Sequence, residues 1–229
     1  MKNLYTVKTV NKFAAALEEA KQDVTAGRDL RVRVSNKNSK MGPVASVSLL
    51  PYITCPARCR GTCAGDCYAA RIANQYNESL RAYSVNTALA MLDPEAFWRQ
   101  VEAAMWAVRF FRLNVAGDII DADFFRRLVD AARHVAGTEI LVFTKRFEIV
   151  NDYLAAGGEI PANLHVLFSG WTNLQPVNPY SLPETNVIQK NAEPEDGWKV
   201  CGGNCFECAC RGVGCWQAKS GDVIAFPIH

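Results

Sequence analysis

Two hydrophobic periods alternate along the chain, one of about 3.6 residues and one of two residues. The longer period predicts helices, because apolar side chains that recur every three or four residues share one helical face. The shorter period predicts strands, because alternate side chains point to opposite sides of a sheet. The predicted helices span residues 11–26, 79–111, 121–135 and 147–156. The predicted strands span residues 30–35, 45–50, 112–116, 139–143, 164–168, 186–189 and 222–227.

Local signals mark where some of the helices begin. Asn11 is suited to cap the first helix. Asp93 and Pro94 divide the region 79–111 into two helices, because aspartate caps a helix and proline suits the first helical position. The aromatic side chains of these helices are expected to pack on the sheet, and they are Trp98, Trp106, Phe110, Phe111, Phe124 and Phe125.

The order of the elements predicts the fold class. Strands and helices alternate through the middle of the chain, which is typical of a parallel sheet with crossover helices. About seven strands favour an open or closed barrel, so we expect an incomplete or modified TIM-like α/β barrel. We expect a single domain over residues 1–229. Within it, residues 1–36 form an N-terminal helix and strand, residues 37–200 a barrel-like core with a first cysteine loop at 55–67, and residues 201–229 a second cysteine loop and a last strand.

Composition narrows the class of protein. The 229 residues carry a net charge of +2, and 49% of them are hydrophobic and 21% charged, which is typical of a globular protein. Such a small net charge gives no general electrostatic reason to bind DNA, RNA or an anionic membrane. The chain has no run of 18 apolar residues and no apolar signal core near its first residue. We therefore expect a cytoplasmic protein, in the host cytoplasm if a phage encodes it, with reduced thiols.

Four of the nine cysteines form a first group with a constant spacing of four residues, Cys55, Cys59, Cys63 and Cys67. On a regular helix they would form a stripe about 18 Å long, which is too long for one metal site. Pro56, Gly61 and Gly65 also disfavour a helix. The segment is therefore predicted to be a loop that folds back and brings several sulfur atoms together.

The other five cysteines lie within 15 residues near the end of the chain. Four glycines are interspersed with them, and glycine lets the backbone turn tightly and present amide groups to an anionic centre. Structural zinc usually takes paired CxxC or CxxC and histidine knuckles, whereas this chain has one CxxC and no histidine beside it. Iron–sulfur clusters tolerate looser spacing. The second group consists of Cys201, Cys205, Cys208, Cys210 and Cys215.

The sequence therefore favours iron–sulfur clusters over zinc, which remains the alternative. We expect one [4Fe–4S] cluster in each group, although a single cluster built from both groups also satisfies the cysteine count. Cys208 and Cys210 are too close in sequence to be ideal joint ligands, so Cys210 is the expected spare thiol. The expected metal ligands are Cys55, Cys59, Cys63, Cys67, Cys201, Cys205, Cys208 and Cys215.

Polar residues follow the predicted strands, where the functional face of a parallel α/β fold lies. Asp118, Lys145 and Lys190 are the candidate catalytic residues, because burial and mutual pairing shift the proton affinity of such groups. Ser169 and Gln189 are candidates for binding a cofactor or ligand. The alternative is that these residues only cap strands and turns, with Asp118 and Lys145 forming an ordinary ion pair.

Eight short motifs resemble the phage gene-product-88 family. They span about residues 37–229, and the cysteine and Gly-Asp motifs are the most specific. The resemblance implies a metal centre and a fold distantly related to radical-SAM-type barrels, in a family with no established activity. The spacing of Cys201, Cys205 and Cys208 also matches the CxxxCxxC of radical SAM enzymes, though near the opposite end of the chain. The motifs are KMGP at 40–43, SVSLLP at 46–51, TCP at 54–56, DCYA at 66–69, NVAGD at 114–118, FTKR at 143–146, CxxC at 205–208 with CW at 215–216, and IAFPIH at 224–229.

Two functions remain open from the sequence. The first is a redox or electron-transfer enzyme, an iron–sulfur oxidoreductase or a radical-SAM-like enzyme, that acts on an unknown small molecule or redox partner. The second is a non-catalytic module that binds nucleic acid or a host protein, with clusters or zinc as structural staples. Its contact residues would be the arginines and aromatic residues near the cysteine groups, Arg58, Arg60, Arg71, Arg81, Tyr52, Tyr68 and Trp216. No histidine is assigned as a ligand among His134, His165 and His229.

Overall fold

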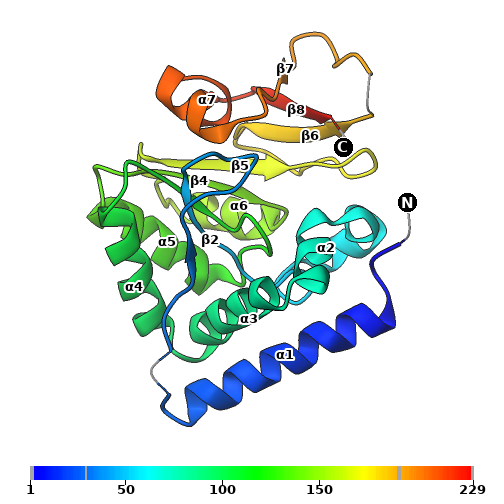
Figure 1. Ribbon diagram of the computed structural model, residues 1–229. Coiled ribbons are helices and arrows are strands. Elements are labelled where there is room, and N and C mark those ends of the chain that lie inside the picture. Colours follow the sequence, from blue (N-terminus) through cyan, green and yellow to red (C-terminus); the bar gives the residue numbers. More distant parts are fainter. Residues whose placement is uncertain (1–2, 29, 190–191, 228–229) are drawn as a thin grey trace.

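A computed structural model describes residues 3–28, 30–189 and 192–227 as helices, strands and connecting loops (Figure 1). The helices are α1 (Val7–Thr25), α2 (Tyr68–Gln75), α3 (Asn77–Leu92), α4 (Pro94–Trp106), α5 (Ala122–His134), α6 (Phe147–Ala155) and α7 (Cys205–Arg211). Short 3-10 helices are η1 (Ala57–Gly61), η2 (Ala64–Asp66) and η3 (Gly214–Gln217). The strands are β1 (Val34–Ser35), β2 (Ala45–Val47), β3 (Phe110–Leu113), β4 (Glu139–Thr144), β5 (Leu164–Ser169), β6 (Glu184–Ile188), β7 (Lys199–Val200) and β8 (Val223–Pro227).

The strands form one sheet in the order β1-β2-β3-β4-β5-β6-β8-β7. Only β1 is antiparallel to its neighbour, and the other pairs are parallel. This confirms the predicted α/β class with a largely parallel sheet. The sheet is not closed, since β1 and β7 stand at its two edges in the described part of the chain.

The two faces of the sheet are covered differently. Helices α1 to α6 pack on one face, where Phe111, Ile140 and Phe168 join the main apolar core. Helix α7 and η3 cover the other face, where Trp216 packs against Leu141 and Leu167 of the central strands (Figure 1). The second cysteine group therefore lies on the face of the sheet opposite to the main helical layer.

Several predicted boundaries are corrected by the structure. Helix α1 begins four residues before Asn11, because the Thr6 hydroxyl accepts a hydrogen bond from the Thr9 amide and caps the helix there. Asp93 caps α4 as predicted, and its carboxylate accepts a hydrogen bond from Ala96 N at 3.0 Å. Phe110 and Phe111 belong to β3 and not to the preceding helix, because α4 ends at Trp106.

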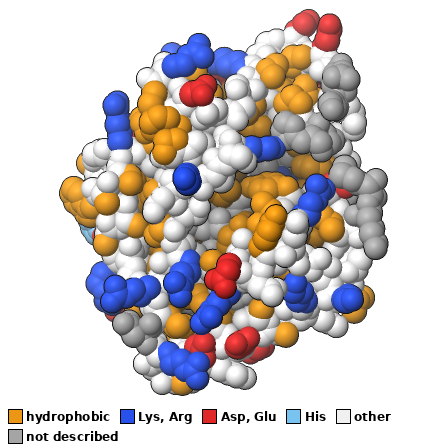
Figure 2. Space-filling view, viewed as in Figure 1, with side chains coloured by type: hydrophobic (Ala, Val, Ile, Leu, Met, Phe, Trp, Pro, Cys, Tyr) orange, Lys and Arg blue, Asp and Glu red, His pale blue; other side chains and the backbone are white. Residues whose placement is uncertain are grey.

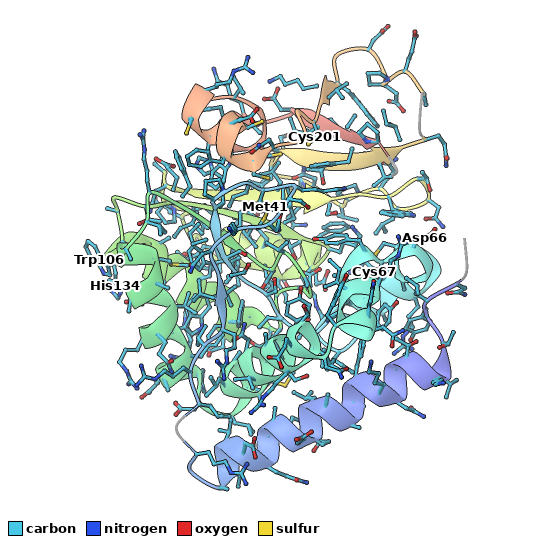
Figure 3. The ribbon with its side chains drawn as sticks, in the orientation of Figure 1. Met41, Asp66, Cys67, Trp106, His134 and Cys201 are labelled. Atoms are coloured by element: carbon cyan, nitrogen blue, oxygen red, sulfur yellow. The ribbon has the colours of Figure 1, made fainter. Side chains whose placement is uncertain are left out.

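The aromatic side chains mostly lie where they were expected. Trp98, Phe124 and Phe125 are buried in the core below the sheet. Trp106 is an exception, since 64% of its surface is exposed, and Figure 3 shows it beside His134 at the outer edge of the helical layer. The prediction that Trp106 packs on the sheet was therefore wrong.

The strand-end side of the molecule is the side that carries candidate chemistry. Figure 2 shows its surface hollowed near the centre, between α2 and strands β5 and β6, with apolar side chains inside and Lys and Arg side chains around the rim. Among the described residues, no helix is long and apolar enough to span a bilayer.

Candidate functional site

The first cysteine group folds back on itself, as the sequence predicts. Two 3-10 turns, η1 and η2, carry it, and Cys67 stands directly before α2. The Cys59 thiol interacts by hydrogen bonds with the thiols of Cys55 and Cys63, and Cys67 interacts electrostatically with Cys63. The four sulfur atoms of this group therefore share one small region after strand β2.

The thiols of the first group favour their neutral form. The hydrogen bond to Cys55 and burial raise the pKa of Cys59 to about 12. The pKa of Cys63 is raised by the hydrogen bond between Cys63 and Cys59 and by burial, whereas the nearby Lys145 ammonium lowers it. Burial also raises the pKa of Cys67, again against a lowering effect of Lys145. A metal would have to displace protons from these sulfur atoms, because thiolates are the metal ligands.

The second cysteine group surrounds helix α7. Asn204 caps α7 by accepting hydrogen bonds from Phe206 N and Glu207 N, which fixes Cys205 and Cys208 on the first turns. Four members of the group lie in one apolar cluster on the sheet face, namely Cys201, Cys205, Cys208 and Cys215. Cys210 is exposed and lies outside that cluster. That Cys210 is the spare thiol stays a prediction.

Two glycines leave room for the Cys208 sulfur atom. A Cβ atom at Gly202 would lie 3.1 Å from Cys208 Sγ, and one at Gly214 would lie 3.5 Å from it. Gly214 also has φ +66°, which favours glycine. The backbone therefore lies close to Cys208 Sγ at two positions, Gly202 and Gly214. A second sulfur atom, Cys201 Sγ, accepts a hydrogen bond from Gly203 N at 3.5 Å.

Burial raises the pKa of the second-group thiols as well. It raises that of Cys215 to about 12, and it also raises those of Cys201 and Cys208. Each of these three thiols interacts electrostatically with Cys205, and Arg112 lowers the pKa of both Cys201 and Cys215. The four clustered thiols therefore interact electrostatically with one another and with one nearby cation.

That cation is Arg112 of β3, which the sequence analysis did not single out. Arg112 is 9% exposed, its Nη1 donates to Cys205 Sγ at 3.4 Å, and its guanidinium carbon lies 4.7 Å from the Phe143 ring centroid. Its buried Nε has no hydrogen-bond partner. Within the described residues, no carboxylate forms an ion pair with it. A basic residue inside the otherwise apolar strand FFRL was the signal in the sequence.

Asp118 and Lys145 meet at the strand ends, but not as an ordinary ion pair. The Asp118 carboxylate accepts hydrogen bonds from Thr144 Oγ1 at 2.6 Å, Lys145 N at 2.9 Å and Ile119 N at 2.8 Å. Burial raises the pKa of the Asp118 carboxyl, and these three bonds oppose that effect. Both carboxylate oxygens are engaged, so Asp118 fixes the backbone at the end of β4.

The Lys145 side chain points to a different set of atoms. Its ammonium donates to Ser169 Oγ at 2.6 Å and to Gly170 O at 3.5 Å, and it lies 5.8 Å from the Trp171 ring centroid. Lys145 is 7% exposed. The structure thus brings together Asp118, Lys145 and Ser169, as predicted. Gln189 is exposed at the end of β6 and apart from these contacts, and Lys190 lies outside the described residues.

Residues considered for nucleic-acid contacts are mostly engaged elsewhere. Trp216 is 3% exposed and donates its Nε1 hydrogen to Cys205 O at 2.9 Å. Tyr52 packs on Phe13 and donates to Ala64 O, and Arg58 pairs with a glutamate at 2.6 Å. Two of the three proposed aromatic contacts are therefore committed to packing within the fold.

Two further residues, Asn114 and Tyr68, have surroundings that the sequence did not predict. Asn114 directly follows β3, with φ +55°; it is 4% exposed, and neither side-chain amide atom has a hydrogen-bond partner. Tyr68, named only as a possible base-stacking residue, donates its hydroxyl hydrogen to the Val115 carbonyl. His165 Nε2 and Glu139 Oε2 form a hydrogen bond of 2.7 Å within the sheet.

The cysteine groups form no disulfide and no compact single-ion site among the described residues. All nine cysteines are free thiols. In the described ranges, no three His, Cys, Asp or Glu side chains converge as one metal ion requires. Four-coordinate zinc with Zn–S bonds of about 2.3 Å needs its sulfur atoms within roughly 4 Å of one another. Within the described ranges, the cysteine side chains therefore form two thiol groups without a preformed site for a single metal ion.

Comparison with known proteins identifies the family. The family model described as gene product 88 matches residues 11–215. No curated protein and no solved structure is significantly similar to the chain. Because the match covers most of the 229 residues, the chain belongs to the gene product 88 family.

Proposed function

We propose that this chain is an iron–sulfur protein that carries out a redox or electron-transfer reaction at the strand-end side of the sheet. The observation that carries the proposal is the buried Arg112 guanidinium, which donates to Cys205 Sγ at 3.4 Å without a described carboxylate partner. A buried charge is costly unless an opposite charge compensates it. Thiols that coordinate a metal lose their protons, so a metal–thiolate group in the second cysteine cluster would supply that charge.

The first cysteine group has a cation of its own. Lys145 is buried, bonds to a serine hydroxyl and a carbonyl, and acts electrostatically on Cys63 and Cys67. Two thiol groups, each beside one buried cation, support one anionic centre per group. The proposed ligands are Cys55, Cys59, Cys63 and Cys67 for the first centre and Cys201, Cys205, Cys208 and Cys215 for the second.

The donor set fits iron–sulfur clusters better than zinc. Each group offers four sulfur atoms and no histidine, and amide groups and glycines surround Cys201 and Cys208. Hydrogen bonds from backbone amides to sulfur are typical of iron–sulfur sites. Structural zinc usually takes paired CxxC units or a CxxC with two histidines, whereas these groups contain one CxxC and no histidine.

The residues at the strand ends have separate roles beside the proposed centres. A bound iron–sulfur centre supplies one-electron chemistry. The Lys145 ammonium, oriented by Ser169, binds and orients a polar ligand at the strand ends. Asp118 is a positioning residue, because both its oxygens hold the backbone and the Thr144 hydroxyl in place. The strand-end location agrees with an incomplete barrel, in which this side is the functional face.

Paired cysteine substitutions test the proposal. Cys55→Ser with Cys59→Ser removes two ligands of the first centre, and Cys205→Ser with Cys208→Ser removes two of the second. Cys210→Ser is the matched control, because Cys210 is exposed and outside the cluster. Under anaerobic purification, each pair is expected to lose about half of the iron and the control none. Equal iron in all three variants, or zinc in place of iron, would overturn the proposal.

A further inference from the structure

Tyr68 contacts the surroundings of both cysteine groups. It directly follows Cys67 and begins α2, and its hydroxyl donates to the carbonyl of Val115. The side chain of Tyr68 is 55% exposed, and its hydroxyl contact with Val115 anchors it over the end of β3. The ring therefore extends from the first cysteine group into the space beside β3.

The second cysteine group lies on the other side of that contact. Val115 packs in the same apolar cluster as the second-group cysteines Cys201, Cys205, Cys208 and Cys215. Arg112, three residues before Val115, donates to Cys205 Sγ. A short path thus joins the groups, from Cys67 through the Tyr68 ring to Val115 and along β3 to Arg112 and Cys205. The Tyr68 hydroxyl also interacts electrostatically with both Cys67 and Cys205.

The thiol contacts themselves stay within each group. Cys59 forms hydrogen bonds with Cys55 and Cys63. The thiols that interact electrostatically with Cys215 all belong to the second group. Figure 3 shows Cys67 at α2 and Cys201 beside the α7 segment, separated along the strand-end side. The groups are therefore neighbours, but they are not interleaved as the ligands of one shared centre would be.

We propose that the two cysteine groups hold two separate centres close enough for direct electron exchange, with the partly exposed Tyr68 in contact with the surroundings of both. The inference rests on the proposed function and adds that the two centres act as one relay. In the exchange, one electron leaves the reduced centre and enters the oxidised one, while no bond breaks and no proton moves. The electrons enter the chain from a low-potential one-electron donor, for which dithionite substitutes in the test.

Electron paramagnetic resonance of the whole chain tests this directly. Stepwise reduction with dithionite first produces chains with one reduced centre, and then chains with two. If the centres are neighbours, the spectrum broadens or splits on full reduction, because the two unpaired spins interact. If the line shape stays constant while only the amplitude grows, the inference is overturned. This test needs no variant, so it stands even if a cysteine substitution prevents folding.

The paired cysteine variants give an independent check. The wild-type spectrum at full reduction is expected to differ from the sum of the spectra of the first-group and second-group variants, and Cys210→Ser is expected to match wild type. Additive spectra with two clusters per chain would overturn the inference and leave the proposed function intact. About four irons per chain, lost entirely in either paired variant, would mean one shared centre and would also overturn it. Absence of iron would refute the proposed function itself.

Discussion

Replacing Arg112 by methionine is expected to lower the reduction potential of the second centre. The substitution keeps a long apolar side chain on the Phe143 ring and removes the positive charge and the hydrogen bond to Cys205. Reduction adds negative charge to the centre, and the guanidinium stabilises the reduced form more than the oxidised form. Without the guanidinium, the reduced form is harder to reach.

The distance of 3.4 Å between Arg112 Nη1 and Cys205 Sγ bounds the size of this effect. At an effective dielectric constant of 20, two full charges at that separation attract by about 5 kcal/mol. A hydrogen bond to a charged group contributes a smaller net amount, about 1.5–3 kcal/mol. For a one-electron couple about 1.4 kcal/mol corresponds to 59 mV, so the expected fall is about 60–130 mV.

In the metal-free chain, the same substitution is expected to stabilise the fold. There Arg112 is a buried cation without a described acidic partner, and its removal is expected to raise the free energy of unfolding by about 1–4 kcal/mol. Redox titration followed by electron paramagnetic resonance measures the first effect, and urea unfolding of the metal-free protein measures the second. Arg109→Met is the matched control, since Arg109 stacks on Phe110 but is exposed. Equal potentials in the Arg112 variant and the control would refute the reasoning.

Three further predictions concern stability. Gly117→Ala is expected to lose at least about 2 kcal/mol in urea unfolding, since Gly117 has φ +75° and a Cβ there would lie 2.6 Å from Thr54 Oγ1. Trp216→Phe removes the 2.9 Å hydrogen bond to the Cys205 carbonyl and is expected to cost about 0.5–1.5 kcal/mol by the same measurement, the net contribution of such a bond; an unchanged midpoint would contradict this. Asp222→Asn is expected to cost about 0.5–1.5 kcal/mol at pH 7, because the bond to Lys199 lowers the pKa of Asp222. That stabilisation is present above the unfolded pKa of about 3.9 and is lost as the pH falls through the lower folded pKa, so the variant and wild type should converge in acid.

The parallel core was predictable because its strands carry their own signal. Segments 139–144 and 164–169 are short and apolar, and each follows a helix, which indicates crossover units whichever residues they contact. The boundary before β3 was not predictable in the same way. Phe110 and Phe111 continue the helical period of α4, and only the tertiary pairing with β2 and β4 places them in a strand.

The cysteine segments were predicted as folded loops, and they proved to be more regular. Helices α2 and α7 begin at Tyr68 and Cys205, where glycines nearby had suggested irregular backbone. Helix α7 has only seven residues, too few for a clear hydrophobic period, and the Asn204 cap fixes its start. Such short helices depend on capping and packing more than on pattern.

The partners of the site residues could be predicted only in part. Polar residues at strand ends identified Asp118, Lys145 and Ser169 correctly as neighbours. The hydrogen bond from Lys145 N to Asp118 depends on the register between β3 and β4. The hydrogen bond from the Lys145 ammonium to Ser169 depends on the register between β4 and β5. Arg112 was missed because a single basic residue in a strand usually faces solvent, and here the second cysteine group covers it.

The metal content of freshly prepared protein tests the central claim most directly. The chain is purified without oxygen, and its iron, acid-labile sulfide and zinc are measured together with its ultraviolet–visible spectrum. The account predicts a brown protein with broad absorption near 400 nm and about eight irons and eight sulfides per chain. A colourless, folded protein that contains stoichiometric zinc or no metal would contradict it.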